Sequence, residues 1–136
     1  MGLDNGICIK RNAYSESIKP LVKAFEKDWA KEYGYSFEVC YWRKCWNIRG
    51  AIIDILEMDI DNDVEVGLSE FNIEDIITFL KSLNEDNWGD YGYSIWEFKG
   101  EDKFYKIIKQ QIKNLKKLLK LMRKYPDLQV YFYDSY

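Results

Sequence analysis

Residues 35–42 read YSFEVCYW, and their pattern decides between two kinds of sheet. From Tyr35 to Tyr41, every second residue is aromatic or aliphatic, a period of two that is typical of a β-strand. Strands inside a parallel sheet are covered on both faces and are continuously apolar, whereas this strand carries Glu38. The pattern therefore favours a sheet with one face toward the core and the other toward water or a partner.

Further segments of the chain alternate between strand and helix patterns on both sides of this strand. Strand patterns fall at residues 3–10, 64–68, 93–98 and 128–133. Helical spacing of apolar residues marks 15–33, 48–56, 72–83 and 101–124, with Asn72 as the expected N-cap of the third helix and Asp75 completing a capping box.

This order would suit a parallel α/β fold, but Glu65, Glu97 and Gln129 interrupt the strands with polar residues. We therefore expect a single α+β domain over residues 1–136. Its sheet would be small, mixed or antiparallel, with about five strands. Helices would pack on one side, with a long amphipathic helix near the C-terminus.

Composition indicates a compact cytoplasmic protein. The 136 residues suit one domain, and the 47% that are hydrophobic suffice for a core. No apolar run approaches the roughly 20 residues of a membrane span, and residues 1–6 do not resemble a signal peptide. The three cysteines, Cys8, Cys40 and Cys45, are too few and too scattered for a disulfide framework.

The chain has no histidine, which excludes several kinds of catalysis. Histidine-activated serine and cysteine nucleophiles are absent, together with the commonest general base near neutral pH. No glycine-rich phosphate loop occurs either. Carboxylate-only catalysis stays open, but we expect binding rather than turnover, and no cofactor.

An acidic segment resembles a calcium-binding loop. Asp59, Asp61, Asp63 and Glu70 occupy positions 1, 3, 5 and 12 of such a loop. Position 6, however, is Val64, where the loop needs glycine. These four carboxylates are weak metal candidates, and an acidic turn is the favoured interpretation.

The charges are unevenly distributed along the chain. Residues 99–124 hold ten lysines and arginines against only Glu101 and Asp102. One side of the expected helix consists of lysines, namely Lys103, Lys106, Lys109, Lys113, Lys117 and Lys120. A solvated helix face is the favoured interpretation, and nucleic-acid binding is the alternative.

The densest group of ligand-suited residues lies between a predicted strand and a predicted helix. It consists of Tyr41, Trp42, Arg43, Lys44, Trp46 and Arg49. Helix N-termini attract anions, aromatic rings stack on bases, and arginines bind phosphates, so these residues are candidates for a nucleotide-like ligand. The favoured interpretation is a core strand that ends in a buried tryptophan, with Arg43 and Arg49 paired to acids, and ligand binding is the alternative.

A second aromatic group suits a protein partner instead. Trp88, Tyr91, Tyr93 and Trp96 could form an exposed patch of anchor residues.

Three short motifs resemble those of an uncharacterised family of small phage and prophage proteins. They are the opening Met1–Asp4, the Tyr-Trp-Arg-Lys motif at Tyr41–Lys44, and the aromatic end at Tyr131–Tyr136. Members often carry Ile-His where this chain has Ile48-Arg49. If that histidine has a role in the family, Arg49 can take over only its positive charge. The resemblance implies a phage accessory protein, of the kind that inhibits host proteins or counters host defence.

Together these features lead to a ranked expectation. First comes a non-enzymatic phage-type binding protein of the bacterial cytoplasm, which sequesters a nucleotide-like signal or blocks a host protein, for instance as a counter-defence factor. The first alternative is a metal-dependent enzyme that acts on a nucleotide through carboxylates. The second is a nucleic-acid binder using the lysine-rich helix. Homo-oligomerisation stays open.

Overall fold

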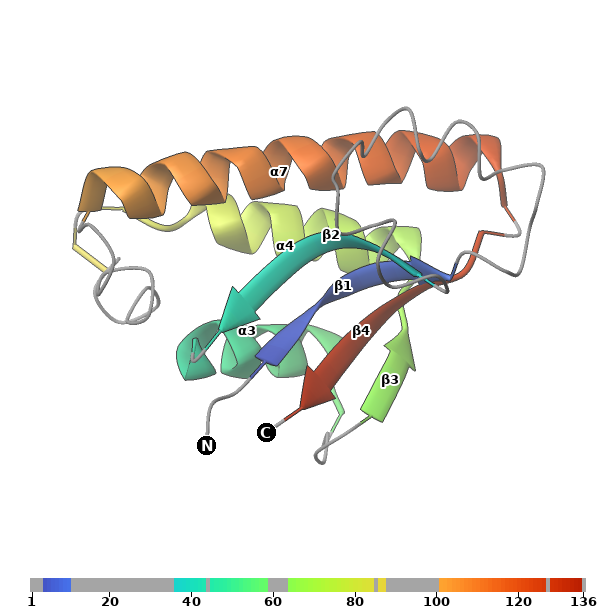
Figure 1. The fold of residues 1–136 in the computed structure, drawn as a ribbon, viewed down its shortest axis with the longest axis horizontal. Coiled ribbons are helices and arrows are strands. Elements are labelled where there is room, and N and C mark those ends of the chain that lie inside the picture. Colours follow the sequence, from blue (N-terminus) through green and yellow to red (C-terminus); the bar gives the residue numbers. More distant parts are fainter. Residues whose placement is uncertain are drawn as a thin grey trace.

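The computed structural model describes residues 4–10, 36–43, 45–58, 64–84, 86–87, 101–126 and 128–135, and these form an α+β fold (Figure 1). In chain order the elements are β1 (Asp4–Lys10), β2 (Ser36–Arg43), α3 (Trp46–Leu56), β3 (Val64–Gly67), α4 (Glu70–Lys81), α7 (Glu101–Lys124) and β4 (Val130–Ser135). The predicted α+β class is confirmed. The expected helix at 15–33 and strand at 93–98 lie outside the described residues, and the described sheet has four strands rather than five.

The sheet is antiparallel throughout. Its strand order is β2-β1-β4-β3, so the first and last strands of the chain lie side by side in its centre (Figure 1). β1 pairs with β2 and β4, and β4 pairs with β3, each time antiparallel. This arrangement agrees with the polar residues of the strands, because an antiparallel sheet can leave one face without a helical layer.

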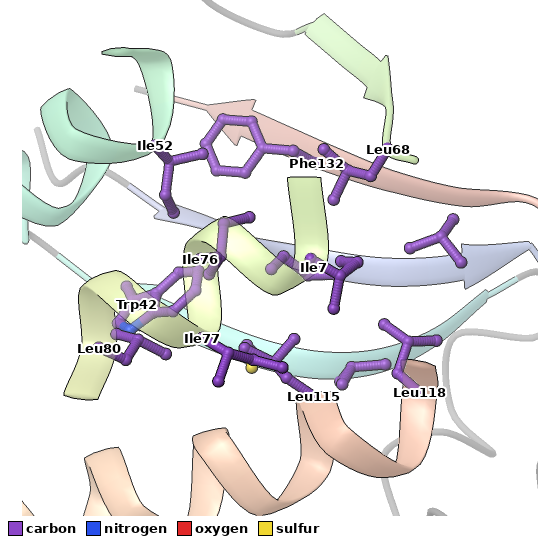
Figure 2. Close-up of a cluster of buried hydrophobic side chains, with 14 of the residues drawn as sticks. Ile7, Trp42, Ile52, Leu68, Ile76, Ile77, Leu80, Leu115, Leu118 and Phe132 are labelled. Atoms are coloured by element: carbon purple, nitrogen blue, oxygen red, sulfur yellow. The ribbon is translucent and has the colours of Figure 1, made fainter. Parts of the chain in front are cut away.

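The core lies between one face of the sheet and the helices. Ile7, Trp42 and Phe132 point from three neighbouring strands toward α3, α4 and α7 (Figure 2). Helix residues such as Ile52 and Ile76 belong to the same buried cluster. Each of these side chains is almost fully shielded from solvent, so their burial supplies the main driving force for folding.

A β-bulge changes which side chains of β2 face the core. The pairs Ile7–Cys40 and Cys8–Glu38 are consecutive on β1, yet Val39 stands between them on β2. An extra residue in one strand shifts the alternation of faces beyond it. As a result, Glu38 shares a face with Tyr41, although the sequence numbers of these two residues differ by an odd amount.

Helix α4 begins earlier than the sequence predicts. Ser69, not Asn72, is its N-cap, so that prediction was wrong. The Ser69 hydroxyl accepts a hydrogen bond from the Asn72 backbone N–H at 3.2 Å, and the Asn72 side-chain oxygen accepts one from the Ser69 N–H at 2.9 Å. This reciprocal capping box stabilises the first turn, with Glu70 placed favourably toward the positive end of the helix dipole.

Helix α7 has 24 residues, which is long enough to cross a membrane, but lysines recur along its length. In the described part of the chain no helix is both long and apolar enough to cross a membrane.

Candidate functional site

The junction between β2 and α3 carries the six predicted ligand residues, but it does not gather them on one surface. Tyr41 and Trp42 are neighbours on a strand and therefore point to opposite faces of the sheet. Trp46 and Arg49 follow in the first turn of α3. Lys44 and the side chain of Arg43 lie outside the described residues.

Trp42 belongs to the core. It is only 1% exposed, and its indole N–H donates a hydrogen bond to the side-chain oxygen of Gln111 at 2.9 Å. The amide of Gln111 in turn donates to the Tyr41 carbonyl at 3.3 Å, which ties α7 to β2. Because the ring of Trp42 is enclosed and its polar atom is satisfied, it offers no free face for a stacked ligand.

Arg49 faces a buried carboxylate. Its Nε and Nη2 atoms lie 2.9 and 2.8 Å from Oδ2 of Asp134, whose side chain is 0% exposed. The guanidinium carbon also lies 5.8 Å from the ring centre of Trp46. A carboxylate removed from water needs a partner of this kind, so Arg49 is committed to the charge of Asp134.

Tyr41 and Trp46 keep substantial contact with solvent. Tyr41 is 38% exposed and Trp46 is 47% exposed. The side chain of Cys45, the N-cap of α3, does not cap the helix. Of the predicted residues that the structure describes, only these two present aromatic surface to a partner.

The face of the sheet opposite α3, α4 and α7, which we call the outer face, carries a group of titratable side chains. The hydroxyl of Tyr133 donates a hydrogen bond to Oε1 of Glu38 at 3.1 Å, and the hydroxyl of Tyr41 donates to Asp4. Cys8 pairs with Glu38 in the sheet register. We call Asp4, Cys8, Glu38, Tyr41 and Tyr133 the outer-face cluster.

Gly6 makes room for this cluster. A Cβ atom at this position would lie 2.3 Å from the Cys40 carbonyl oxygen and 2.9 Å from Cε1 of Tyr133. Both distances are shorter than real contacts, so only glycine allows the Tyr133 ring to cross the strand and reach Glu38.

Three members of the outer-face cluster, Cys8, Glu38 and Tyr133, favour their protonated forms. Burial raises the pKa of Glu38 from 4.5 to about 8; the hydrogen bond from Tyr133 opposes this shift and the charge of Asp4 adds to it. Burial, followed by the charge of Glu38, also raises the pKa of the Cys8 thiol and the Tyr133 phenol well above their usual ranges. Glu38 can therefore donate a proton at neutral pH, but neither Cys8 nor Tyr133 is activated as a nucleophile.

Stability should consequently depend on the ionisation of Glu38. The folded state holds the proton up to about pH 8, whereas the unfolded chain releases it near pH 4.5. Between these values the unfolded state binds fewer protons, so the free energy of unfolding should fall as pH rises, by at most about 1.4 kcal/mol per pH unit.

Urea unfolding of wild type and Glu38→Gln at pH 5, 6, 7 and 8 tests this dependence. Glu38→Gln should flatten the fall, because the amide cannot ionise. Asp75→Asn, an exposed change on α4 and far from the cluster in the fold, is the control and should keep the wild-type slope. Parallel pH profiles for wild type and Glu38→Gln would show that Glu38 is not the group responsible.

The other predicted sites are mostly outside the described residues. This holds for Asp59, Asp61 and Asp63 of the acidic segment, and for the aromatic group Trp88, Tyr91, Tyr93 and Trp96. Glu70, the last weak metal candidate, begins α4 and pairs with Arg123 at 3.1 Å. Among the residues that the structure does describe, no three potential ligands lie close enough to hold a metal ion.

The lysines of α7 are displayed as the sequence predicts. Every lysine of this helix is exposed, including Lys116 and Lys124. Arg123 is the cation that pairs with acids, at 3.1 Å from Glu70 and 2.7 Å from Glu74.

Two buried polar residues of this region escape an analysis based on motifs. Gln111 occupies a core position of α7, at helical spacing between Ile108 and Leu115. A polar residue in the middle of an apolar stripe indicates a buried hydrogen bond, and Gln111 forms that bond with Trp42. Asp134 carries no such signal, because its burial depends on a sheet register that only the fold reveals.

Comparison with known proteins finds no matching family model, no matching curated protein and no matching solved structure. The arrangement of the chain's own residues is therefore the basis for a functional proposal.

Proposed function

We propose that this chain is a non-enzymatic, phage-type accessory protein that binds and blocks a host protein in the bacterial cytoplasm, as a counter-defence factor would. The observation that carries the proposal is the division of the β2–α3 junction. Its buried members hold the fold together, whereas Tyr41 and Trp46 leave aromatic surface exposed.

This division favours a protein partner over a nucleotide. A nucleotide site needs stacking faces and phosphate-binding groups that converge on one ligand. Here the ring of Trp42 is enclosed, and the guanidinium of Arg49 is bound to Asp134. Exposed tyrosine and tryptophan are, by contrast, the residues that most often anchor protein interfaces.

Capture from a bacterial lysate tests the proposal. The wild-type protein should retain one dominant host protein, and Trp46→Ala should lose it while its melting temperature stays close to that of wild type. Phe71→Ala is the matched control, because Phe71 is 76% exposed on a different helix, α4. Equal losses in both variants would indicate unspecific capture by exposed apolar groups and would contradict the proposal.

A melting-temperature screen against linear, cyclic and NAD-derived nucleotides tests the sequestering version of the same role. A ligand at 100 times its Kd stabilises a protein by about 2.7 kcal/mol, which such a screen detects easily. We expect no selective shift. A clear shift with one nucleotide, lost in Trp46→Ala, would replace the host-protein proposal with nucleotide sequestration.

A further inference from the structure

The lysines of α7 form a continuous stripe along the helix. Its members are Lys103, Lys106, Lys109, Lys113, Lys116, Lys117 and Lys120, all of them exposed. With 3.6 residues per turn, they fall within a sector of about 140° and extend over about 26 Å. Between positions 103 and 120 this sector contains only lysine and Gln110, with no acidic or aromatic residue. We call these seven residues the lysine stripe.

The rest of the fold holds this stripe in a fixed orientation. The other side of α7 is buried in the core through Phe104, Ile108, Leu115 and Leu118. Gln111 on the same side accepts a hydrogen bond from the Trp42 indole. The apolar side of the helix is therefore already occupied by the protein itself. It cannot enter a lipid bilayer without unfolding the domain, so the stripe meets a partner through charge alone.

Acidic residues of the described part of the chain do not neutralise the stripe. The carboxylates Glu70 and Glu74 approach α7 only near its C-terminus, and there they bind Arg123. No ion pair joins a stripe lysine to a described carboxylate. Among the described carboxylates, the stripe therefore has no acidic partner, in a chain whose net charge is −3.

The composition of the stripe selects its partner. Protein interfaces are enriched in arginine and aromatic residues and depleted in lysine. A nucleic-acid backbone needs only positive charge from its partner, because lysines that neutralise phosphates release the counterions bound there. Single-stranded nucleic acids are bound by stacking on aromatic rings, which the stripe lacks. The major groove of B-form DNA is wide enough to admit an α-helix between its two rows of phosphates, whereas the major groove of A-form RNA is narrow.

We propose that the lysine stripe binds double-helical DNA through its phosphates, without reading the sequence. Base recognition places side chains such as arginine or glutamine against base edges. The stripe has no arginine, and the amide of Gln110, the other residue in its sector, donates a hydrogen bond to Asn114 at 2.9 Å. This surface is separate from Tyr41 and Trp46, so the inference goes beyond the proposed function and does not depend on it.

Fluorescence anisotropy with a 20-base-pair DNA duplex at several salt concentrations tests the inference. Wild type should bind at low salt, and log K should fall linearly with log salt concentration. The variant with Lys106, Lys109, Lys113 and Lys117 all changed to Gln should bind at least tenfold more weakly at 0.1 M salt. Its salt slope should be smaller by up to about 3.6, since each phosphate contact contributes about 0.9.

Three controls separate charge from folding and from the other surface. Arginine at the same four positions should preserve binding, Lys81→Gln on α4 should leave it unchanged, and Trp46→Ala should not affect it. Circular dichroism verifies that the glutamine variant keeps its helix, as expected because glutamine is a good helix former. Failure of wild type to bind DNA at low salt would overturn the inference, as would equal binding by the glutamine variant or a preference for duplex RNA or an acidic protein.

Discussion

Replacing Trp42 with alanine is expected to lower the free energy of unfolding by about 3–5 kcal/mol, the usual cost of removing a large buried aromatic side chain. The indole is 1% exposed and lies among core residues from the sheet and the helices (Figure 2). Its loss would also leave the side-chain oxygen of Gln111 without its donor. Chemical denaturation followed by circular dichroism measures the change.

Trp46→Ala is the natural control for this experiment, because the same residue type stands four positions away with 47% of its surface exposed. Surface substitutions usually change stability by about 0.5 kcal/mol or less, and here the lost contact with Arg49 adds a modest cost. If both tryptophans cost the same, the assignment of one to the core and the other to a binding surface would be wrong.

The second large effect is expected at Arg49. Arg49→Met keeps much of the side-chain volume but leaves the buried carboxylate of Asp134 without its cation, and breaking a buried ion pair in this way costs about 3–5 kcal/mol. The double variant Arg49→Met/Asp134→Asn carries no buried charge at this place. It should recover at least half of the lost stability.

A double-mutant cycle of denaturant unfolding measures this coupling. Additive effects of the two substitutions would show that Arg49 and Asp134 do not depend on each other. In that case Arg49 would again be a candidate for contact with a ligand.

Local patterns in the sequence predict much of the fold. Polar residues in the strands, such as Glu38, correctly argue against a parallel sheet. The apolar spacing of Phe104, Ile108 and Leu115 identifies the core side of α7. These features depend on neighbours along the chain, so a period of 2 or 3.6 residues reveals them.

What the sequence could not predict depends on pairing between distant segments. The bulge at Val39 shifts the alternation of β2, so Tyr41 falls on the outer face with Glu38 rather than in the core. Cross-strand pairing places Asp134 where Arg49 can reach it. A motif read along Tyr41–Arg49 therefore joins residues that the fold separates.

We propose that Trp46 contacts a partner, whereas Trp42 and Arg49 support the fold. The most direct test is the Kd of the captured host protein, once purified, for the wild-type protein and for Trp46→Ala. We expect binding at least tenfold weaker in the variant, which corresponds to about 1.4 kcal/mol or more, with an almost unchanged melting temperature. Equal dissociation constants would contradict the claim and remove the β2–α3 junction as the binding surface.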